Sequence, residues 1–209
     1  MTAGTVGVIV LAAGASTRLG RPKQSLPYGD GTLLGHAVAE ALAAGLGPVL
    51  VVLGAHGQEL AETLPAGALA VPNPGWQEGM ASSIRAGLAA LQRGWPQTEA
   101  AIVMVCDQPA VNAHLLRRLA DAWHRHGAVA VACSYGDTLG VPALFDRTLW
   151  PELMALRGDR GAKAVLERHR EATVLVPFPE GDLDIDTLED WQRLQGGHRS
   201  GPTPPRTEG

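Results

Sequence analysis

Short apolar runs alternate with helical segments along most of the chain, and this alternation limits the fold more than any other feature. The runs with strand composition are Val6–Leu11, Pro48–Leu53, Ala68–Val71, Ala101–Cys106, Val129–Cys133 and Thr173–Val176. The segments with helical spacing between them are Leu33–Ala44, Met80–Gln92, Asn112–Arg125 and Gly161–Arg170. Strands that alternate with helices form a mostly parallel sheet with helices on both faces. The sequence therefore predicts an α/β fold, a Rossmann-like sheet flanked by helices.

Length and composition indicate one domain. A chain of 209 residues fits a single α/β domain, which we place at residues 1–195. Residues 196–209, GGHRSGPTPPRTEG, contain no apolar residue that could anchor them, so we expect a disordered C-terminal tail. Cys106 and Cys133 lie in apolar runs, where buried free thiols are expected.

The charge and the first residues exclude two classes of partner. A formal net charge of −4 argues against nucleic acid as a partner. The start, MTAGTVGVIVLAAG, has no basic region before its apolar stretch, and that stretch is too short to span a bilayer. We therefore expect a cytoplasmic protein that has no membrane partner.

The first strand opens into a loop suited to phosphate. Residues 6–23, VGVIVLAAGASTRLGRPK, place small residues directly after the strand and the cations Arg18 and Lys23 further on. Small residues let the backbone approach a phosphate chain, and cations offset charge on phosphoryl oxygens. The loop is not a Walker A loop, because five residues separate Gly14 from Gly20. The G-x-G-x-x-G pattern of dinucleotide-binding folds is also missing.

A carboxylate follows the predicted central strand. Asp107 comes directly after Ala101–Cys106, and ligands of parallel sheets gather at the carboxyl ends of the strands. The cationic loop and Asp107 are thus expected on one edge, where a metal–nucleotide complex would need them. A structural alternative is that Asp107 caps the turn that follows it.

The pattern L-A-A-G-x-S-x-R-x-G-x-x-K at residues 11–23, with further motifs in the same order, resembles the MobA-like nucleotidyltransferases, and within them the molybdenum cofactor cytidylyltransferases. The further motifs are D-x-P at 107–109, N-P-x-W-x-x-G-M-x-x-S-[IL]-x-x-G at 73–87, G-x-P-x-L-F at 140–145, G-D-x-G-A-[RK] at 158–163, and a D-I-D-T segment at 184–187. The resemblance implies a fold of the nucleotide-diphospho-sugar transferase type.

The resemblance also implies the site residues. It makes Arg18, Lys23 and Asp107 catalytic, and it implies a Mg²⁺ ion held by Asp107 and Asp186, with Asp184 a weaker choice for the second contact. The nucleotide-binding residues that it implies are Leu11, Ala12, Ala13, Gly14, Arg18, Lys23, Gly79, Ser83 and Asp107. Two structural alternatives remain: Asp186 or Thr187 caps the last helix, and Ser83 is a plain hydroxyl at a helix start.

The acceptor segments are implied in the same way, as Gly140, Pro142 and Lys163. Many cytidylyltransferases of this kind have His where this chain has Val141, which weakens the assignment of molybdopterin as acceptor. A solvated lysine at a helix start is an equal alternative for Lys163.

Together these features predict Mg²⁺-dependent transfer of a nucleoside monophosphate from an NTP to a phosphorylated acceptor, with release of pyrophosphate. Ala13 favours CTP, because relatives that use GTP usually have Gly there, and molybdopterin is the implied acceptor. Contact with a molybdenum enzyme is a further implied partnership. Two alternatives stay open: transfer to a sugar or polyol phosphate, and a non-catalytic module that binds molybdenum cofactor and hands it to a dehydrogenase.

Overall fold

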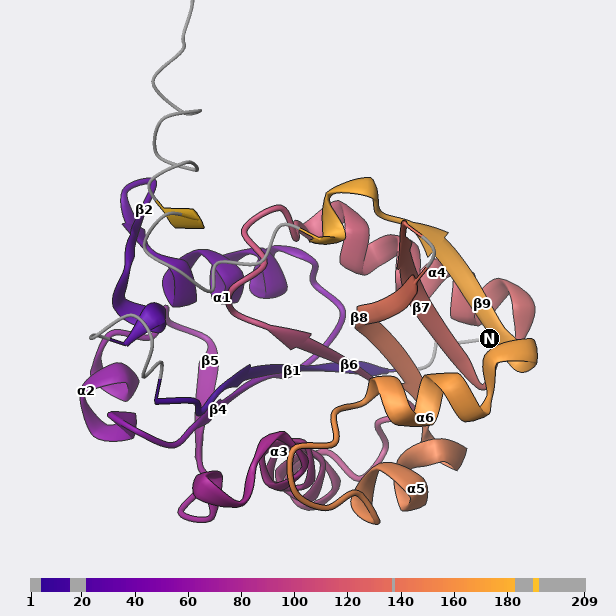
Figure 1. Ribbon diagram of the computed structural model, residues 1–209, viewed down its shortest axis with the longest axis horizontal. Coiled ribbons are helices and arrows are strands. Elements are labelled where there is room, and N and C mark those ends of the chain that lie inside the picture. The colour runs from indigo at the N-terminus through magenta and orange to yellow at the C-terminus, as the bar shows by residue number, and fades with distance from the viewer. Residues whose placement is uncertain (1–4, 16–21, 137, 183–189, 192–209) are drawn as a thin grey trace, which may run out of the picture.

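The structure is a computed structural model that describes residues 5–15, 22–136, 138–182 and 190–191. Within these residues a seven-stranded sheet has the order β5-β4-β1-β6-β8-β7-β9 (Figure 1). Its strands are β1 Val6–Ala12, β4 Val49–Leu53, β5 Ala68–Pro72, β6 Ala100–Val105, β7 Ala130–Tyr135, β8 Thr138–Asp146 and β9 Thr173–Pro177. The predicted boundary at residue 195 and the predicted tail at 196–209 lie outside the described residues.

The sheet confirms the predicted α/β class and adds one strand. Every expected strand is present, with ends shifted by at most a few residues. Strand β8 was not expected, and it runs antiparallel to both of its neighbours, β6 and β7. The other neighbouring pairs of this sheet, in the described part of the chain, are parallel.

The glycine and proline of β8 hid this strand from a reading of the sequence. The register between β7 and β8 shifts beside Ala132, so that Ala132 pairs with Ala143 while the next residue pairs with Gly140. Val141 and Pro142 therefore lie at the irregularity, where the missing N–H of a proline removes no regular ladder hydrogen bond.

Helices cover both faces of the sheet. They are α1 Leu33–Ala43, α2 Gly57–Glu62, α3 Met80–Gly94, α4 Ala113–His126, α5 Trp150–Met154 and α6 Lys163–Arg168. Helices α1 and α4 lie on one face, and α3, α5 and α6 lie on the other (Figure 1). The remaining short elements are the hairpin β2 Pro27–Tyr28 with β3 Gly31–Thr32, and the 3₁₀ turns η2 Lys23–Ser25, η3 Trp76–Glu78, η4 Arg147–Leu149, η5 Arg170–Ala172 and η6 Pro179–Asp182.

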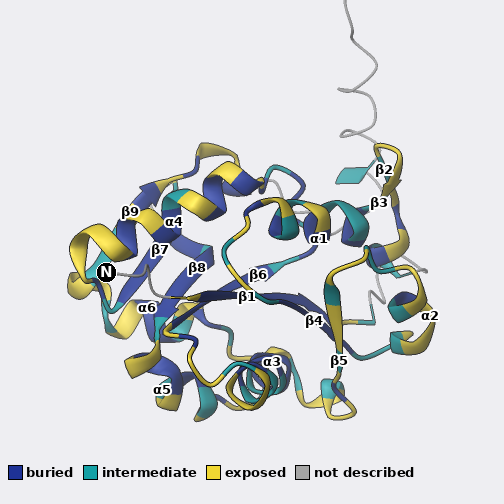
Figure 2. Cartoon of the chain, turned by 180° about the vertical axis from the view of Figure 1, so that it is seen from behind, coloured by how far each residue is buried: buried dark blue, intermediate teal, exposed yellow. Residues whose placement is uncertain are grey.

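Each face of the sheet has its own apolar core. Val8 and Val10 of β1 pack with α1 and α4, whereas Ile9 packs with α3, because successive side chains of a strand point to opposite faces. The inner strands β1, β4 and β6 are buried between these two layers, whereas the edge strands β5 and β9 are partly exposed (Figure 2). At Gly87 the helix comes so close that a Cβ would lie 2.5 Å from Cγ2 of Ile9, so α3 packs tightly beneath β1.

The helix ends follow the sequence signals. Asn112 caps α4, since its side chain accepts a hydrogen bond of 3.0 Å from the backbone N–H of Leu115. Helix α1 stops before Gly45, whose φ of +66° is the left-handed conformation that commonly ends a helix. The last expected helix, 161–170, is shorter than predicted.

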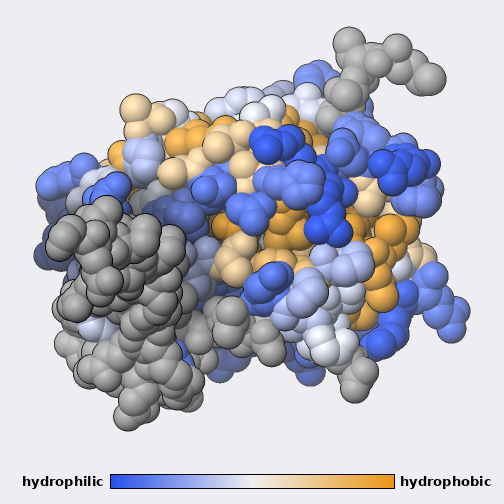
Figure 3. Space-filling view, turned by 90° about the horizontal axis from the view of Figure 1, so that it is seen from above, coloured by the Kyte–Doolittle hydropathy of each residue, from blue (hydrophilic) through white to orange (hydrophobic). Residues whose placement is uncertain are grey.

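On the face of the molecule viewed in Figure 3, hydrophobic residues are interrupted by hydrophilic ones. The large apolar side chains that are exposed, among those the structure describes, are Leu69, Met80 and Leu175. In the described residues no helix combines the length and the apolar character needed to cross a bilayer.

Candidate functional site

A cavity of about 440 Å³ lies at the carboxyl ends of β1 and β6. Its lining residues are Leu11, Ala12, Ala13, Gly14, Lys23, Gln24, Trp76, Gln77, Gly79, Met80, Ser83, Val105, Cys106, Asp107 and Asp159. Every described residue among the predicted nucleotide-binding set is in this lining. Arg18 lies outside the described residues. The structure thus brings the predicted residues together, while their roles toward a nucleotide stay predictions.

Strand pairing explains why loop and carboxylate meet. β1 and β6 are parallel neighbours, and Leu11 pairs with Val105 in their register. The chain leaves β1 at Ala13 and leaves β6 at Cys106, so the glycine loop and Asp107 emerge side by side on the edge where such sheets bind ligands.

The loop after β1 is held from beneath by Gln24, a residue that the sequence reasoning did not assign to the site. Its Nε2 donates hydrogen bonds to the carbonyl oxygens of Ala12 (2.9 Å) and Gly14 (2.8 Å), and its side chain is almost fully buried. The carbonyl oxygen between them, on Ala13, accepts from the backbone N–H of Ala55 at 3.2 Å. Three successive carbonyl dipoles are therefore engaged by protein donors, which lowers their repulsion toward an anion in the cavity.

Lys23 and Asp107, which both line the cavity, form a direct ion pair between Nζ and Oδ2. Both side chains are largely buried, with 22% and 13% of their surfaces exposed. The other carboxylate oxygen, Oδ1 of Asp107, is buried and accepts no hydrogen bond from the described residues. The hydrogen bond by which Asp107 would cap the following turn is therefore missing at Oδ1 among the described residues.

A buried carboxylate oxygen without a donor suits a cation. Magnesium takes oxygen ligands and commonly uses one or two protein carboxylates together with phosphates and waters, so Asp107 fits the implied ion. Asp184 and Asp186 lie outside the described residues. Within the described ranges, no group of three or more His, Cys, Asp or Glu residues could hold a metal.

The opposite wall comes from the start of α3. Asn73, which follows β5, donates from Nδ2 to the hydroxyl oxygens of Ser82 (2.8 Å) and Ser83 (3.1 Å). Ser82 in turn donates to the carbonyl oxygen of Gly79 at 2.9 Å. Because the Ser83 oxygen accepts from Asn73, the hydroxyl can still donate its own proton to another acceptor, as a binding hydroxyl requires. The Asn-Pro turn draws attention to Asn73 in the sequence, but the sequence does not indicate that the side-chain amide of Asn73 binds the hydroxyls of Ser82 and Ser83.

Gly79 is the tightest point of this wall. Its φ is +119°, and a Cβ there would collide with Oδ1 of Asp159 and lie 2.5 Å from the carbonyl oxygen of Gly158. A glycine is therefore required both by conformation and by space. The contact also brings Asp159, which was not predicted as a site residue, into the cavity lining.

Cys106 lines the cavity as a neutral thiol. Burial raises the pKa of Cys106 to about 12, with the charge of Asp107 acting in the same direction. Burial likewise raises the pKa of Cys133 to about 12. Both cysteines are free and buried, as the sequence predicts.

The predicted acceptor residues do not line this cavity. Gly140 and Pro142 belong to β8, and a Cβ on Gly140 would collide with the ring of Tyr135. Lys163 begins α6 and donates to Oγ1 of Thr138 at 2.8 Å. Their role toward an acceptor stays a prediction.

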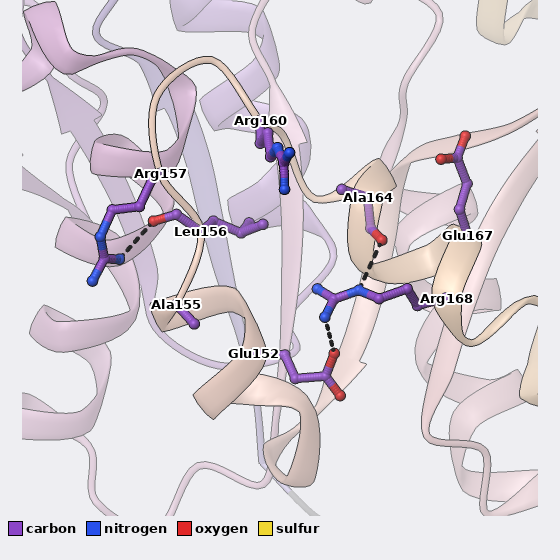
Figure 4. A pocket seen from close by; sticks show the side chains of 8 residues that line it. All are labelled: Glu152, Ala155, Leu156, Arg157, Arg160, Ala164, Glu167 and Arg168. Carbon is purple, nitrogen blue, oxygen red and sulfur yellow. Dashed lines mark hydrogen bonds and ion pairs between the residues drawn. The ribbon is translucent and has the colours of Figure 1, made fainter.

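A second cavity of about 570 Å³ opens between α5 and α6, with Arg157, Arg160 and Arg168 in its lining (Figure 4). Arg168 pairs with Glu152 at 2.9 Å, and Arg157 donates to the Leu156 carbonyl at 2.8 Å. Two of its three arginines are thus occupied within the protein. Residues 155–160 separate the two cavities, since Asp159 lines the first cavity and Arg157 and Arg160 line the second.

Comparison with known families agrees with this geometry. The model of the MobA-like NTP transferase domain matches residues 8–173, which contain the whole described lining of the first cavity. The chain belongs to this family.

Named relatives of this family member differ in activity. It is 34% identical to nicotine blue oxidoreductase of Paenarthrobacter nicotinovorans, over 89% of this chain and 94% of that protein. It is 31% identical to molybdenum cofactor guanylyltransferase of Rhizobium meliloti (strain 1021), over 90% and 89%. It is 25% identical to molybdenum cofactor cytidylyltransferase of Escherichia coli (strain K12), over 89% and 93%.

Solved structures show the same fold. Rv0371c from Mycobacterium tuberculosis H37Rv superimposes with a TM-score of 0.80 at 34% identity, covering 93% of this chain and all of that one (100%). A structure of Rv0371C in complex with manganese gives a TM-score of 0.76 at 32% identity, covering 91% and 97%.

Proposed function

We propose that this protein is a Mg²⁺-dependent nucleotidyltransferase that transfers a nucleoside monophosphate from an NTP to a phosphorylated acceptor and releases pyrophosphate. One observation carries the proposal: Asp107, with one oxygen paired to Lys23 and the other buried without a donor among the described residues, lines the same cavity as the glycine loop. Membership of the MobA-like family supports the reaction class. The expected cytoplasmic location stays part of the proposal.

The reaction forms one bond and breaks another. A phosphate oxygen of the acceptor attacks the α-phosphorus of the NTP, the bond from that phosphorus to the bridging oxygen breaks, and pyrophosphate leaves with the electron pair. An acceptor phosphomonoester carries a charge of about −1.5 to −2 near neutral pH, so it needs no general base. Positioning and charge neutralisation are then the main tasks of the site.

The chain supplies these two tasks from named residues. The loop held by Gln24 supports the triphosphate, and Lys23 neutralises its charge. The ammonium of Lys23 has three donors, so it can keep Asp107 and still donate to a phosphate oxygen. Arg18 is proposed to add a second cation. Asp107 would hold Mg²⁺, with Asp186 as the second contact, and the ion would offset charge on the phosphates when bound.

CTP is the proposed donor and molybdopterin the proposed acceptor. Ala13 favours CTP, and one relative carries the name of a molybdenum cofactor cytidylyltransferase. Val141, in place of the more usual His, keeps a sugar or polyol phosphate as the alternative acceptor. Gly140, Pro142 and Lys163 are the proposed acceptor contacts.

An oxidoreductase is the second candidate, because the relative at 34% identity bears that name. One experiment separates the candidates: pyrophosphate release with Mg²⁺ and each of CTP, GTP, ATP and UTP, with and without molybdopterin, beside an assay of NADPH and NADH oxidation with nicotine blue as the electron acceptor. Release with CTP plus molybdopterin supports the proposal in full. Release with another NTP corrects the donor, and redox turnover without any pyrophosphate release would overturn the proposal.

A further inference from the structure

Two segments far apart in the sequence form one wall of the first cavity. The backbone N–H of Ala81 donates to the carbonyl oxygen of Gly158 at 3.1 Å. The N–H of Gly158 donates to Oε1 of Glu78 at 3.3 Å. The segment around α3 and the loop at residues 155–162 are therefore joined directly beside the cavity.

An ion pair between Glu78 and Arg85, which we call the clamp, holds these two segments together. Arg85 donates from Nη1 to Oε1 (3.0 Å) and from Nη2 to Oε2 (2.5 Å) of Glu78, the two-pronged geometry that makes such pairs strong and directional. The same Nη1 also donates to the carbonyl oxygen of Leu156 at 2.8 Å. Hydrogen bonds from Arg85 hold the pKa of the Glu78 carboxyl below its usual range, so the pair stays charged at neutral pH.

The clamp holds two residues of the short stretch that leads directly into Asp159. Leu156 is held by Arg85, Gly158 is held by Glu78, and Asp159 follows at once. The Asp159 carboxylate comes against Gly79 and lines the cavity, where it makes no hydrogen bond or ion pair with any described residue. A carboxylate placed there can accept hydrogen bonds and repels phosphate.

The cavity lining carries charges of both signs. Lys23 and the glycine loop are the part of the lining suited to the triphosphate, whereas Asp159, which lies against Gly79, offers an acceptor that is matched to neutral donors. A nucleoside has such donors in its ribose hydroxyls and, in cytosine, in an exocyclic amino group.

We propose that Asp159 accepts a hydrogen bond from the nucleoside part of the bound NTP, and that Glu78 and Arg85 are positioning residues that hold it there. This inference rests on the proposed function, because it needs an NTP in the cavity.

Equilibrium binding of Mg²⁺–CTP to the full chain, measured by calorimetric titration without acceptor, tests the inference. Asp159→Asn removes the charged acceptor and is expected to raise the Kd about tenfold or more, the range for a hydrogen bond to a charged group. Arg85→Lys keeps the charge but loses the two-pronged geometry, and Glu78→Gln removes the charge of the partner. Each of these two substitutions is expected to raise the Kd for Mg²⁺–CTP severalfold when Asp159 is present. Each should raise the Kd little further when it is combined with Asp159→Asn. Asp121→Asn, an exposed carboxylate on α4, is the matched control and should bind as the parent chain does.

Nucleotide analogues identify the donor. With 2′-deoxy-CTP, 3′-deoxy-CTP and UTP, the analogue that lacks the donor should bind the parent chain more weakly, and Asp159→Asn should weaken it no further. Unchanged CTP binding by folded Asp159→Asn overturns the inference and leaves the proposed function standing. An effect on the acceptor KM without an effect on CTP binding does the same. A folded parent chain that binds no NTP overturns the proposed function and this inference together.

Discussion

The side-chain amide of Gln24 joins the two ends of the turn after β1, since it donates to the carbonyl oxygens of both Ala12 and Gly14. A buried side chain that makes two such bonds is a rigid brace for a loop made of small residues. Gln24 therefore fixes the course of the backbone where this loop lines the cavity.

We expect Gln24→Glu to lower catalytic activity by more than its loss of folding stability alone would explain. It replaces two donors by a carboxylate that faces two carbonyl oxygens, so the loop must move. We expect kcat/KM to fall about tenfold or more and unfolding free energy to fall by about 1–3 kcal/mol. Pyrophosphate release and urea denaturation measure the two effects, with exposed Gln92→Glu as control. A parent-like kcat/KM would show that the loop does not depend on the brace.

Asp107→Asn should abolish turnover while the fold is kept. The change removes the negative charge that pairs with Lys23 and that attracts a metal ion, and it replaces one of the two carboxylate oxygens by an amide nitrogen. By analogy with charge-stabilising donors, about 3–4 kcal/mol of barrier lowering should be lost. Pyrophosphate release over a Mg²⁺ titration and circular dichroism provide the measurement. Full activity in this variant would exclude Asp107 from the metal site.

Gly79→Ala should destabilise the protein and disturb the cavity, since the new Cβ meets Gly158 and Asp159 and the residue must keep a φ of +119°. The backbone conformation alone costs on the order of 1–3 kcal/mol. Gly94→Ala, at the end of α3 with nothing within 4 Å of the new Cβ, is the matched control and should be nearly neutral. Thermal unfolding of the two variants compares them, and equal melting temperatures would contradict the steric account.

Alkaline pH should destabilise the protein through its two thiols. The pKa of each is raised from 9.0 to about 12 by burial, so folding favours the protonated form. This contribution to stability is therefore complete below pH 9 and is lost as the pH rises toward 12. Denaturant unfolding at pH 8 and 10.5 should show a smaller loss for Cys106→Ala combined with Cys133→Ala than for the parent chain. Rapid alkylation of folded protein at pH 8 would contradict the burial of the thiols.

Hydrophobic periodicity and the ends of the apolar runs were enough to predict the α/β fold class and the meeting of Gly14 and Asp107 at one cavity. Apolar runs such as those that contain Leu11 and Val105 defined the strands, and the ends of those strands placed Gly14 and Asp107 on one edge. These signals are local in the sequence, and a parallel sheet converts them directly into proximity.

The residues that were missed depend on contacts between distant segments. The side chain of Gln24 binds the backbone of the loop after β1, and that of Asn73 binds two serine hydroxyls. Asp159 follows residues held by Glu78 and Arg85, which lie seven residues from each other and more than seventy residues before Asp159. Strand β8 was missed because Gly140 and Pro142 break the strand pattern where the ladder itself is irregular. No local pattern encodes such relationships.

The place of β8 in the sheet gives the β7–β8 hairpin a protective role. Strands β1, β4, β5 and β6 form four adjacent parallel strands from the first half of the chain, and within the described residues β6 pairs on its other side with β8. A chain that lacked the hairpin would present β6 as an unpaired, almost wholly apolar edge strand. Such an edge favours pairing with other chains, so β8 protects the protein from aggregation by covering it.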